Sequence, residues 1–138
     1  MLNDHTYCCQ AAASICELGE PQLDKAEVCR KFHFGKLKVR DADAKRYGVP
    51  LFYTEFGACF DGEECAVEIN NSCDAFDSQL SSWSYWMYKS FGDFTTTGGP
   101  KEGMYNPDGT PQAQKLKALT RTYMHAFQGT PNSMYFST

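Results

Sequence analysis

The clearest structural signal in this chain is the stretch Val49–Gly57, with the sequence VPLFYTEFG. It is a short, nearly continuous apolar run bounded by proline and glycine, a pattern that indicates a parallel strand buried on both faces. Its polar residues, Thr54 and Glu55, fall at the C-terminal end. An acidic group there is costly to bury without partners, so Glu55 is the first candidate for a functional residue. The alternative is a glutamate at a strand end that points to water.

Further strands and helices are expected on both sides of this strand. The expected elements are strands over residues 2–8 and 82–88, and helices over residues 36–47, 74–80 and 110–120. Gly48 stands where one helix would end, and Thr110 and Pro111 stand where another would begin. An acidic loop is expected over residues 59–73 and a long loop over residues 91–110, and loops of that length are usually functional.

The alternation of strands and helices predicts an α/β fold with a parallel sheet. The 138 residues fit one ordinary domain. They are too few for a complete eight-fold α/β barrel, which needs about 250 residues. The pattern alone also permits an open doubly wound sheet, but no glycine-rich nucleotide motif supports it.

The cysteine content indicates disulfides in a secreted or lumenal protein. There are seven cysteines, so one is expected to be free or paired elsewhere. A zinc site is the rival interpretation, but no matched Cys-x-x-Cys pairs are present, and no metal or other cofactor is expected. The triplet Asn70-Asn71-Ser72 is a glycosylation sequon, which would suit a surface loop beside Cys73.

Charge and hydropathy argue against nucleic-acid binding and against a membrane-spanning helix. The net charge is −4, and no long basic cluster is present, so nucleic acid is not expected to bind. No apolar run approaches the roughly 18 residues that a transmembrane helix needs. Residues 2–5 show neither the basic nor the apolar region of a signal peptide, which makes Met1 a doubtful natural start.

Four further side chains are candidates for a site. His5 and Tyr7 lie two residues apart, so they share one face of their strand and could donate hydrogen bonds to a carboxylate or to sugar hydroxyls. They could equally be packed side chains with ordinary partners. Trp83 and Trp86 could be core residues, or one of them could form a stacking platform for a sugar.

Three motifs together resemble glycoside hydrolase family 5. The stretch Thr54–Ala58 resembles the nucleophile strand of that family, Asp4–Cys8 resembles its sixth strand, and Ser82–Lys89 resembles its eighth strand. They occur in family order. The tail over residues 121–131 resembles the joint at which endoglycoceramidase-like members pass into a C-terminal β-sandwich.

The resemblance implies a fold and a set of roles. Residues 1–126 would form strands 6 to 8 of a (β/α)8 TIM barrel with their helices, and residues 127–138 would form a linker and the first part of a β-sandwich. Glu55 would be the nucleophile of a retaining glycosidase, and Tyr7 would orient it. The residues that would bind substrate are His5, Trp86, Trp83 and Lys89.

The substrate implied by the resemblance is an oligosaccharide or a glycolipid glycan. A glycolipid would bring the protein into transient contact with a membrane surface, and the parent protein would be extracellular or lysosomal. A β-glucanase or steryl-glucosidase activity in the same family is the near alternative.

One departure from the family is decisive for activity. The Asn-Glu-Pro motif that carries the general acid/base is absent, and the acidic residues Glu63, Glu64 and Glu68 match no such motif. A retaining mechanism needs two carboxyl groups about 5–5.5 Å apart. The chain alone is therefore expected to be an inactive fragment. A non-catalytic carbohydrate-binding remnant, or a cystine-stapled secreted domain with no sugar role, are the other interpretations.

Overall fold

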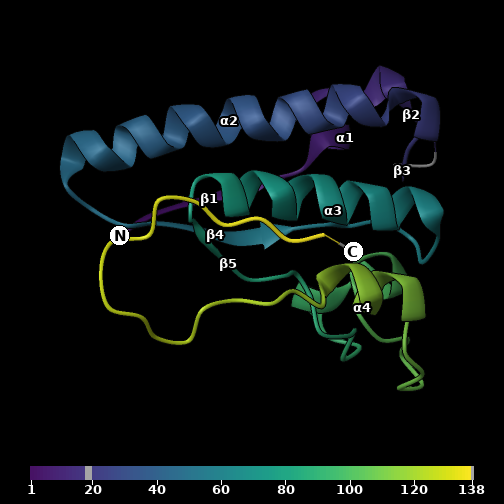
Figure 1. Cartoon of the computed structure of the whole chain (residues 1–138). Coiled ribbons are helices and arrows are strands. Elements are labelled where there is room, and N and C mark those ends of the chain that lie inside the picture. Colours follow the sequence, from purple (N-terminus) through teal and green to yellow (C-terminus); the bar gives the residue numbers. More distant parts are fainter. Residues whose placement is uncertain (18–19, 138) are drawn as a thin grey trace.

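The computed structural model describes residues 1–17 and 20–137 and shows a mixed α/β fold (Figure 1). Its centre is a three-stranded parallel sheet in the order β1-β4-β5. The strands are β1 (Leu2–Thr6), β4 (Leu51–Phe56) and β5 (Ser82–Trp83). Two long helices, α2 (Ala26–Tyr47) and α3 (Glu63–Ser78), lie along one side of the sheet. The parallel sheet predicted from the alternation of elements is thus confirmed.

Short elements surround this centre. They are α1 (Cys8–Ala11), α4 (Ala113–Leu119), the antiparallel pair β2 (Cys16–Glu17) and β3 (Glu20–Pro21), and 3₁₀ helices at Ala13–Ile15, Leu23–Lys25, Phe94–Thr96 and Gly99–Lys101. In the part of the chain that is described, no helix is both long and apolar enough to span a bilayer.

Strand β4 lies between the other two strands, as its apolar run predicts. Tyr53 and Phe56 are fully buried, and each ring packs 5.0 Å from the ring of Phe76 on α3. The pairing with β1 is irregular near the C-terminal ends of the two strands. Tyr53 pairs with Asp4 and Glu55 pairs with His5, so Thr54 has no paired residue in β1. Bulges of this kind re-aim side chains and are common beside active sites.

Helix α2 ends where the sequence predicts but begins ten residues earlier. Gly48 adopts a left-handed conformation with φ 64° and closes the last turn, because glycine meets no Cβ penalty there. The buried stripe of the helix starts at Cys29 and His33 and continues to Leu37. The first half of this helix buries a cysteine and a histidine, so its buried face does not show the apolar periodicity that predicts a helix.

The predicted acidic loop over residues 59–73 is wrong. Helix α3 occupies most of it, and its buried side recurs at helical spacing in Cys65, Glu68, Ile69 and Ser72. Two of these four residues are polar, which is why the pattern does not reveal a helix. The sequon therefore lies inside a helix and not in a surface loop.

Three other boundaries differ from the prediction. β5 covers only Ser82–Trp83, and contact with the sheet then continues as a single bridge between Gly57 and Trp86. Thr110 does not cap α4, because its hydroxyl donates to Asp108 instead. The expected strand after residue 127 is absent from the described residues, which are irregular from 120 to 137.

Three disulfides lie near the edge of the sheet at which the parallel strands have their C-terminal ends. They are Cys8–Cys29, Cys9–Cys16 and Cys59–Cys65. Cys73 is free and buried in α3, so the inference of one unpaired cysteine from the odd count is confirmed.

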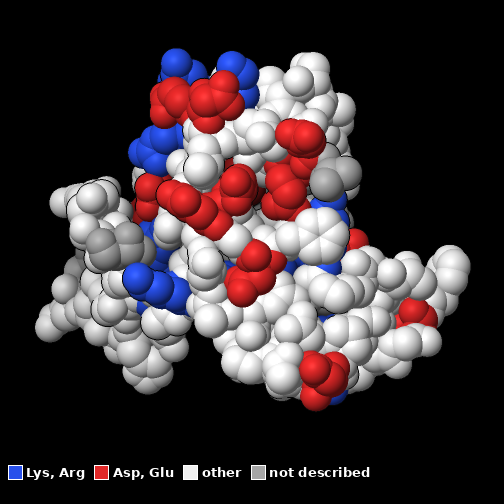
Figure 2. Space-filling model, turned by 90° about the vertical axis from the view of Figure 1, so that its right-hand side faces the viewer, with Lys and Arg blue, Asp and Glu red and all other residues white. Residues whose placement is uncertain are grey.

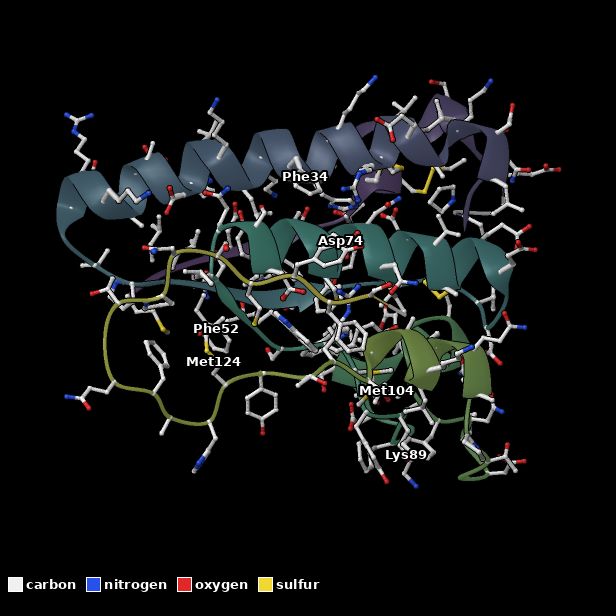
Figure 3. The ribbon with its side chains drawn as sticks, viewed as in Figure 1. Phe34, Phe52, Asp74, Lys89, Met104 and Met124 are labelled. Atoms are coloured by element: carbon white, nitrogen blue, oxygen red, sulfur yellow. A yellow bond between two sulfur atoms is a disulfide. The ribbon has the colours of Figure 1, made fainter. Side chains whose placement is uncertain are left out.

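An ion cluster fastens the C-terminal segment to the helices. Asp74 of α3, labelled in Figure 3, accepts from Arg30 of α2 at 2.9 Å and from Arg121 at 3.0 Å. Arg121 also reaches Asp77 at 3.1 Å and the side-chain oxygen of Asn70 at 2.9 Å. The Arg121 side chain is 5% exposed and that of Asp74 is 30% exposed, so the cluster is partly buried.

Candidate active site

Glu55 is held by two side chains from the end of β1. The Tyr7 hydroxyl donates to Oε2 of Glu55 at 3.2 Å, and Nδ1 of His5 lies 3.2 Å from the same oxygen. The structure thus brings together the three residues that the motifs single out. The Glu55 side chain is 27% exposed, so it is neither free in water nor sealed in the core. Among the described residues, none makes a hydrogen bond to Oε1.

The fold explains why these residues meet. β1 and β4 are parallel, so their carboxyl ends lie at one edge of the sheet, and ligands in α/β proteins bind at that edge. Figure 2 views this end of the molecule and shows acidic side chains gathered across its middle. The bulge at Thr54 brings Glu55 level with His5.

The environment of Tyr7 keeps it a hydrogen-bond donor. Burial raises its pKa well above the ordinary value for tyrosine, and the charge of Glu55 and the hydrogen bond to it raise the pKa further. The phenol therefore stays protonated over the whole physiological pH range. Its proton can stabilise and orient the carboxylate.

The other carboxylate in the same strand is already paired. Asp4 accepts from Nε of Arg40 at 2.9 Å, and Nζ of Lys36 lies 3.5 Å from its other oxygen. Lys36 also donates to the backbone oxygen of His5. The motif Asp4–Cys8 includes Asp4, but no role was expected for this residue.

These groups line a cleft of about 500 Å³, which we call the Glu55 cleft. Its walls are formed by Asn3, Asp4, His5, Tyr7, Gln10, Ala11, Phe32, Lys36 and Glu55. The volume is within the range of small-molecule sites in proteins. Polar groups dominate the lining, which suits a hydroxylated ligand better than an apolar one.

The two tryptophans have different surroundings. Trp83 packs edge-on against Phe56, with ring centroids 5.3 Å apart, and stacks on Phe76. Trp83 is therefore a partly buried residue at the edge of the hydrophobic core. Trp86 donates from Nε1 to Oε2 of Glu102 at 3.1 Å, so its indole is oriented by a polar contact. Its peptide bond to Met87 is cis.

Lys89 lies further from the sheet. Figure 3 labels it below α4, and its ammonium lies 5.5 Å from the centre of the Phe91 ring. It is not among the residues that line the Glu55 cleft.

Glu102, the partner of Trp86, does not line the Glu55 cleft, and the sequence does not reveal its contact with Trp86, because it stands in the long loop without a motif. A buried lysine shapes the segment around it. Nζ of Lys115 donates to the backbone oxygens of Pro100, Lys101 and Gly103 at 3.3, 3.1 and 2.9 Å. Burial lowers the pKa of Lys115 to about 8. The loop thus holds Glu102 against Trp86 by contacts that no local pattern encodes.

One group of side chains is close enough to share a metal ion: Cys8, Cys29 and Glu68. The two sulfur atoms are joined in a disulfide, so they offer no thiolate to a metal. The donor set therefore does not suit a metal site.

Comparisons with protein-family models, with curated proteins and with solved structures found no match to this chain. Any function of the chain must therefore be inferred from the geometry of the site. A carboxylate that accepts a hydrogen bond from Tyr7 on one oxygen, with His5 beside that oxygen and the other oxygen unused, can act as a nucleophile toward an electrophilic carbon.

Proposed function

We propose that the chain is the nucleophile half of a retaining glycosidase site, in an endoglycoceramidase-like member of glycoside hydrolase family 5. The observation that carries this proposal is the convergence of Tyr7 and His5 on Oε2 of Glu55 at the carboxyl edge of a parallel sheet. The proposal takes the three strands as strands 6 to 8 of a barrel and residues 127–138 as the approach to a second domain.

Glu55 is the nucleophile in this mechanism. Its Oε1 attacks the anomeric carbon, the bond from that carbon to the leaving oxygen breaks, and a covalent glycosyl ester remains on Glu55. Tyr7 keeps its proton and holds Oε2. His5, next to the carboxylate and open to solvent, contacts hydroxyls of the reacting sugar.

A proton donor for the leaving oxygen is not available from the neighbouring carboxylates. Asp4 is paired with Arg40 and Lys36, and Glu102 accepts from Trp86. General acid catalysis typically contributes 10²–10⁴-fold. The chain alone is therefore expected to form the covalent ester only when the leaving group needs no protonation.

The disulfides support an oxidising compartment, and we place the parent protein outside the cell or in the lysosomal lumen. The substrate class is an oligosaccharide or the glycan of a glycolipid. In the second case the lipid would keep the cleft at a membrane surface while the protein remains outside the bilayer.

The test is covalent labelling with 2,4-dinitrophenyl 2-deoxy-2-fluoroglucoside, whose dinitrophenolate leaves without an acid. The intact chain should gain one fluoroglucosyl group, mapped by peptide mass to Glu55, with release of one dinitrophenolate. Glu55→Gln should abolish labelling. Tyr7→Phe should slow it about tenfold, because a hydrogen bond to a charged group contributes about 1.5 kcal/mol at the weak end of its range. Tyr47→Phe, at an exposed tyrosine, is the matched control.

A second candidate is a carbohydrate-binding module without chemistry. The engagement of both Asp4 and Glu102 in other contacts favours it. Sugar binding in the Glu55 cleft, together with no label on Glu55 after prolonged incubation, would select this candidate over the first.

A further inference from the structure

Side chains bind both backbone polar groups of His5. The N–H of His5 donates to Oδ1 of Asp4 at 2.8 Å, and its carbonyl oxygen accepts from Nζ of Lys36 on α2. These contacts lie where the pairing of β1 with β4 shifts, between Asp4 and His5. A register shift disrupts the regular ladder of hydrogen bonds, so side chains that bind the backbone there fix its path.

Asp4 links this position to helix α2. Its Oδ2 accepts from Nε of Arg40 at 2.9 Å, and its Oδ1 lies 3.5 Å from Nζ of Lys36. Lys36 and Arg40 are four residues apart, so they are neighbours on one face of the helix. One carboxylate therefore joins two successive turns of α2 to the backbone of the residue that carries the imidazole.

The backbone of His5 determines what its ring can reach. The register shift aligns His5 with Glu55, and Nδ1 of the ring lies 3.2 Å from Oε2 of the carboxylate. The His5 side chain is 45% exposed, so packing restrains it on one side only. A displaced backbone would move the ring away from Glu55, and groups at a reacting centre act only within a narrow geometry.

We propose that Asp4 is a positioning residue of the Glu55 site, which holds the backbone of His5 at the register shift and so keeps the imidazole beside Oε2 of Glu55. Lys36 assists, because it binds the carbonyl oxygen of the same residue. This inference rests on the proposed function, in which Glu55 is the nucleophile. Asp4 then acts on the reaction through His5 and not as a proton donor.

The tautomer of His5 reports this role without any need for catalysis. A neutral imidazole carries one proton, on Nδ1 or on Nε2. A carboxylate oxygen 3.2 Å from Nδ1 favours the proton on Nδ1, because the other tautomer would set a lone pair against the negative charge. A ring without that neighbour prefers the proton on Nε2. The tautomer therefore shows whether the ring still lies beside Glu55.

The test is a long-range ¹H–¹⁵N NMR spectrum of the neutral His5 ring in the oxidised full chain, with Asp4→Ala as the variant. The change removes the acceptors of both His5 and Arg40. The wild type should carry the ring proton on Nδ1, and the variant mainly on Nε2. The fluorosugar should label Glu55 about tenfold more slowly in the variant, as the loss of one contact to a charged group predicts.

Asp43→Ala is the matched control. Asp43 accepts from the same Arg40 at 3.0 Å, but it does so within α2. This control should leave the tautomer and the labelling rate unchanged. The Arg40 side chain is 43% exposed, so its ion pair with Asp4 contributes little to stability and Asp4→Ala should fold.

A folded Asp4→Ala protein that keeps the proton on Nδ1, or that is labelled at the wild-type rate, would overturn the role of Asp4. If this variant does not fold, Lys36→Met replaces it, with the same two measurements and the same expected changes. Failure of the proposed function has a different signature: the fluorosugar does not label Glu55 in the wild type. The tautomer then decides the role of Asp4 by itself.

Discussion

Replacing Arg121 by methionine should destabilise the protein by about 3 kcal/mol. The guanidinium is 5% exposed, and it neutralises Asp77, whose side chain is 7% exposed. Removing one partner of a buried pair typically costs 3–5 kcal/mol, because the other charge stays buried without compensation. We take the lower end, since Asp74 keeps its contact with Arg30 and the stem of methionine fills part of the space.

The loss of stability in Arg121→Met should be larger at neutral pH than at acidic pH. Burial raises the pKa of Asp77, and the charge of Arg121 lowers it in partial compensation. Without Arg121 the folded-state pKa rises further above that of the unfolded chain. A raised carboxyl pKa means that the folded state binds the proton more tightly, so stability falls as the pH rises through this window. The variant should therefore lose more stability at pH 7 than at pH 4.

The assay is equilibrium unfolding in urea, followed by the fluorescence of Trp83 and Trp86. Arg30→Met is the matched control, because it removes another arginine from Asp74 but at a site that is 39% exposed. An exposed pair contributes about 0.2–1 kcal/mol. Equal losses in the two variants, or a loss for Arg121→Met that is independent of pH, would show that Arg121 does not neutralise a buried Asp77.

Two further predictions concern buried groups. Lys115→Met removes three hydrogen bonds to backbone oxygens of the loop. Each bond contributes a net of about 0.5–1.5 kcal/mol, and burial of the methionine side chain offsets part of the loss. The free energy of unfolding should therefore fall by about 2 kcal/mol. Thermal unfolding and faster amide exchange at Met87 and Met104 measure this, whereas Lys117→Met, exposed on the same helix, should change neither. Burial raises the pKa of Cys73 to about 12, so the folded protein should not react with a disulfide reagent at pH 8, while the denatured protein should react at once. Because the unfolded thiol loses its proton first, stability should fall by up to about 1.4 kcal/mol per pH unit from pH 9 to 12, and Cys73→Ala should show a shallower fall; identical slopes would contradict the assignment.

Much of the sheet could be predicted from the sequence because its signals are local. The apolar run of β4, the glycine that ends α2 and the odd number of cysteines each act through a short-range constraint. The resemblance to the glycosidase family implied that Tyr7 contacts Glu55, and two parallel strands that end at one edge make this possible. The register shift that aligns Glu55 with His5 has no local signal in the sequence.

The other features depend on contacts between distant segments. α3 buries Glu68 and Ser72, and both side chains contact Nε2 of His33 on another helix. No periodicity of apolar residues indicates this arrangement. Glu102 contacts Trp86 while Lys115 binds backbone oxygens of the loop that carries Glu102. The capping role of Thr110 was wrong because a nearby aspartate competes for its hydroxyl.

The hydrogen bond from Arg121 to Asn70 has a consequence for glycosylation of the sequon. The side-chain oxygen of Asn70 is bound by the guanidinium, and Ser72 of the same sequon is buried beside His33. Transfer of an oligosaccharide to Nδ2 of Asn70 would add a bulky group beside the amide oxygen that Arg121 binds. In a compartment that glycosylates this sequon, the modification would therefore compete with the contact that fastens the C-terminal segment to α3.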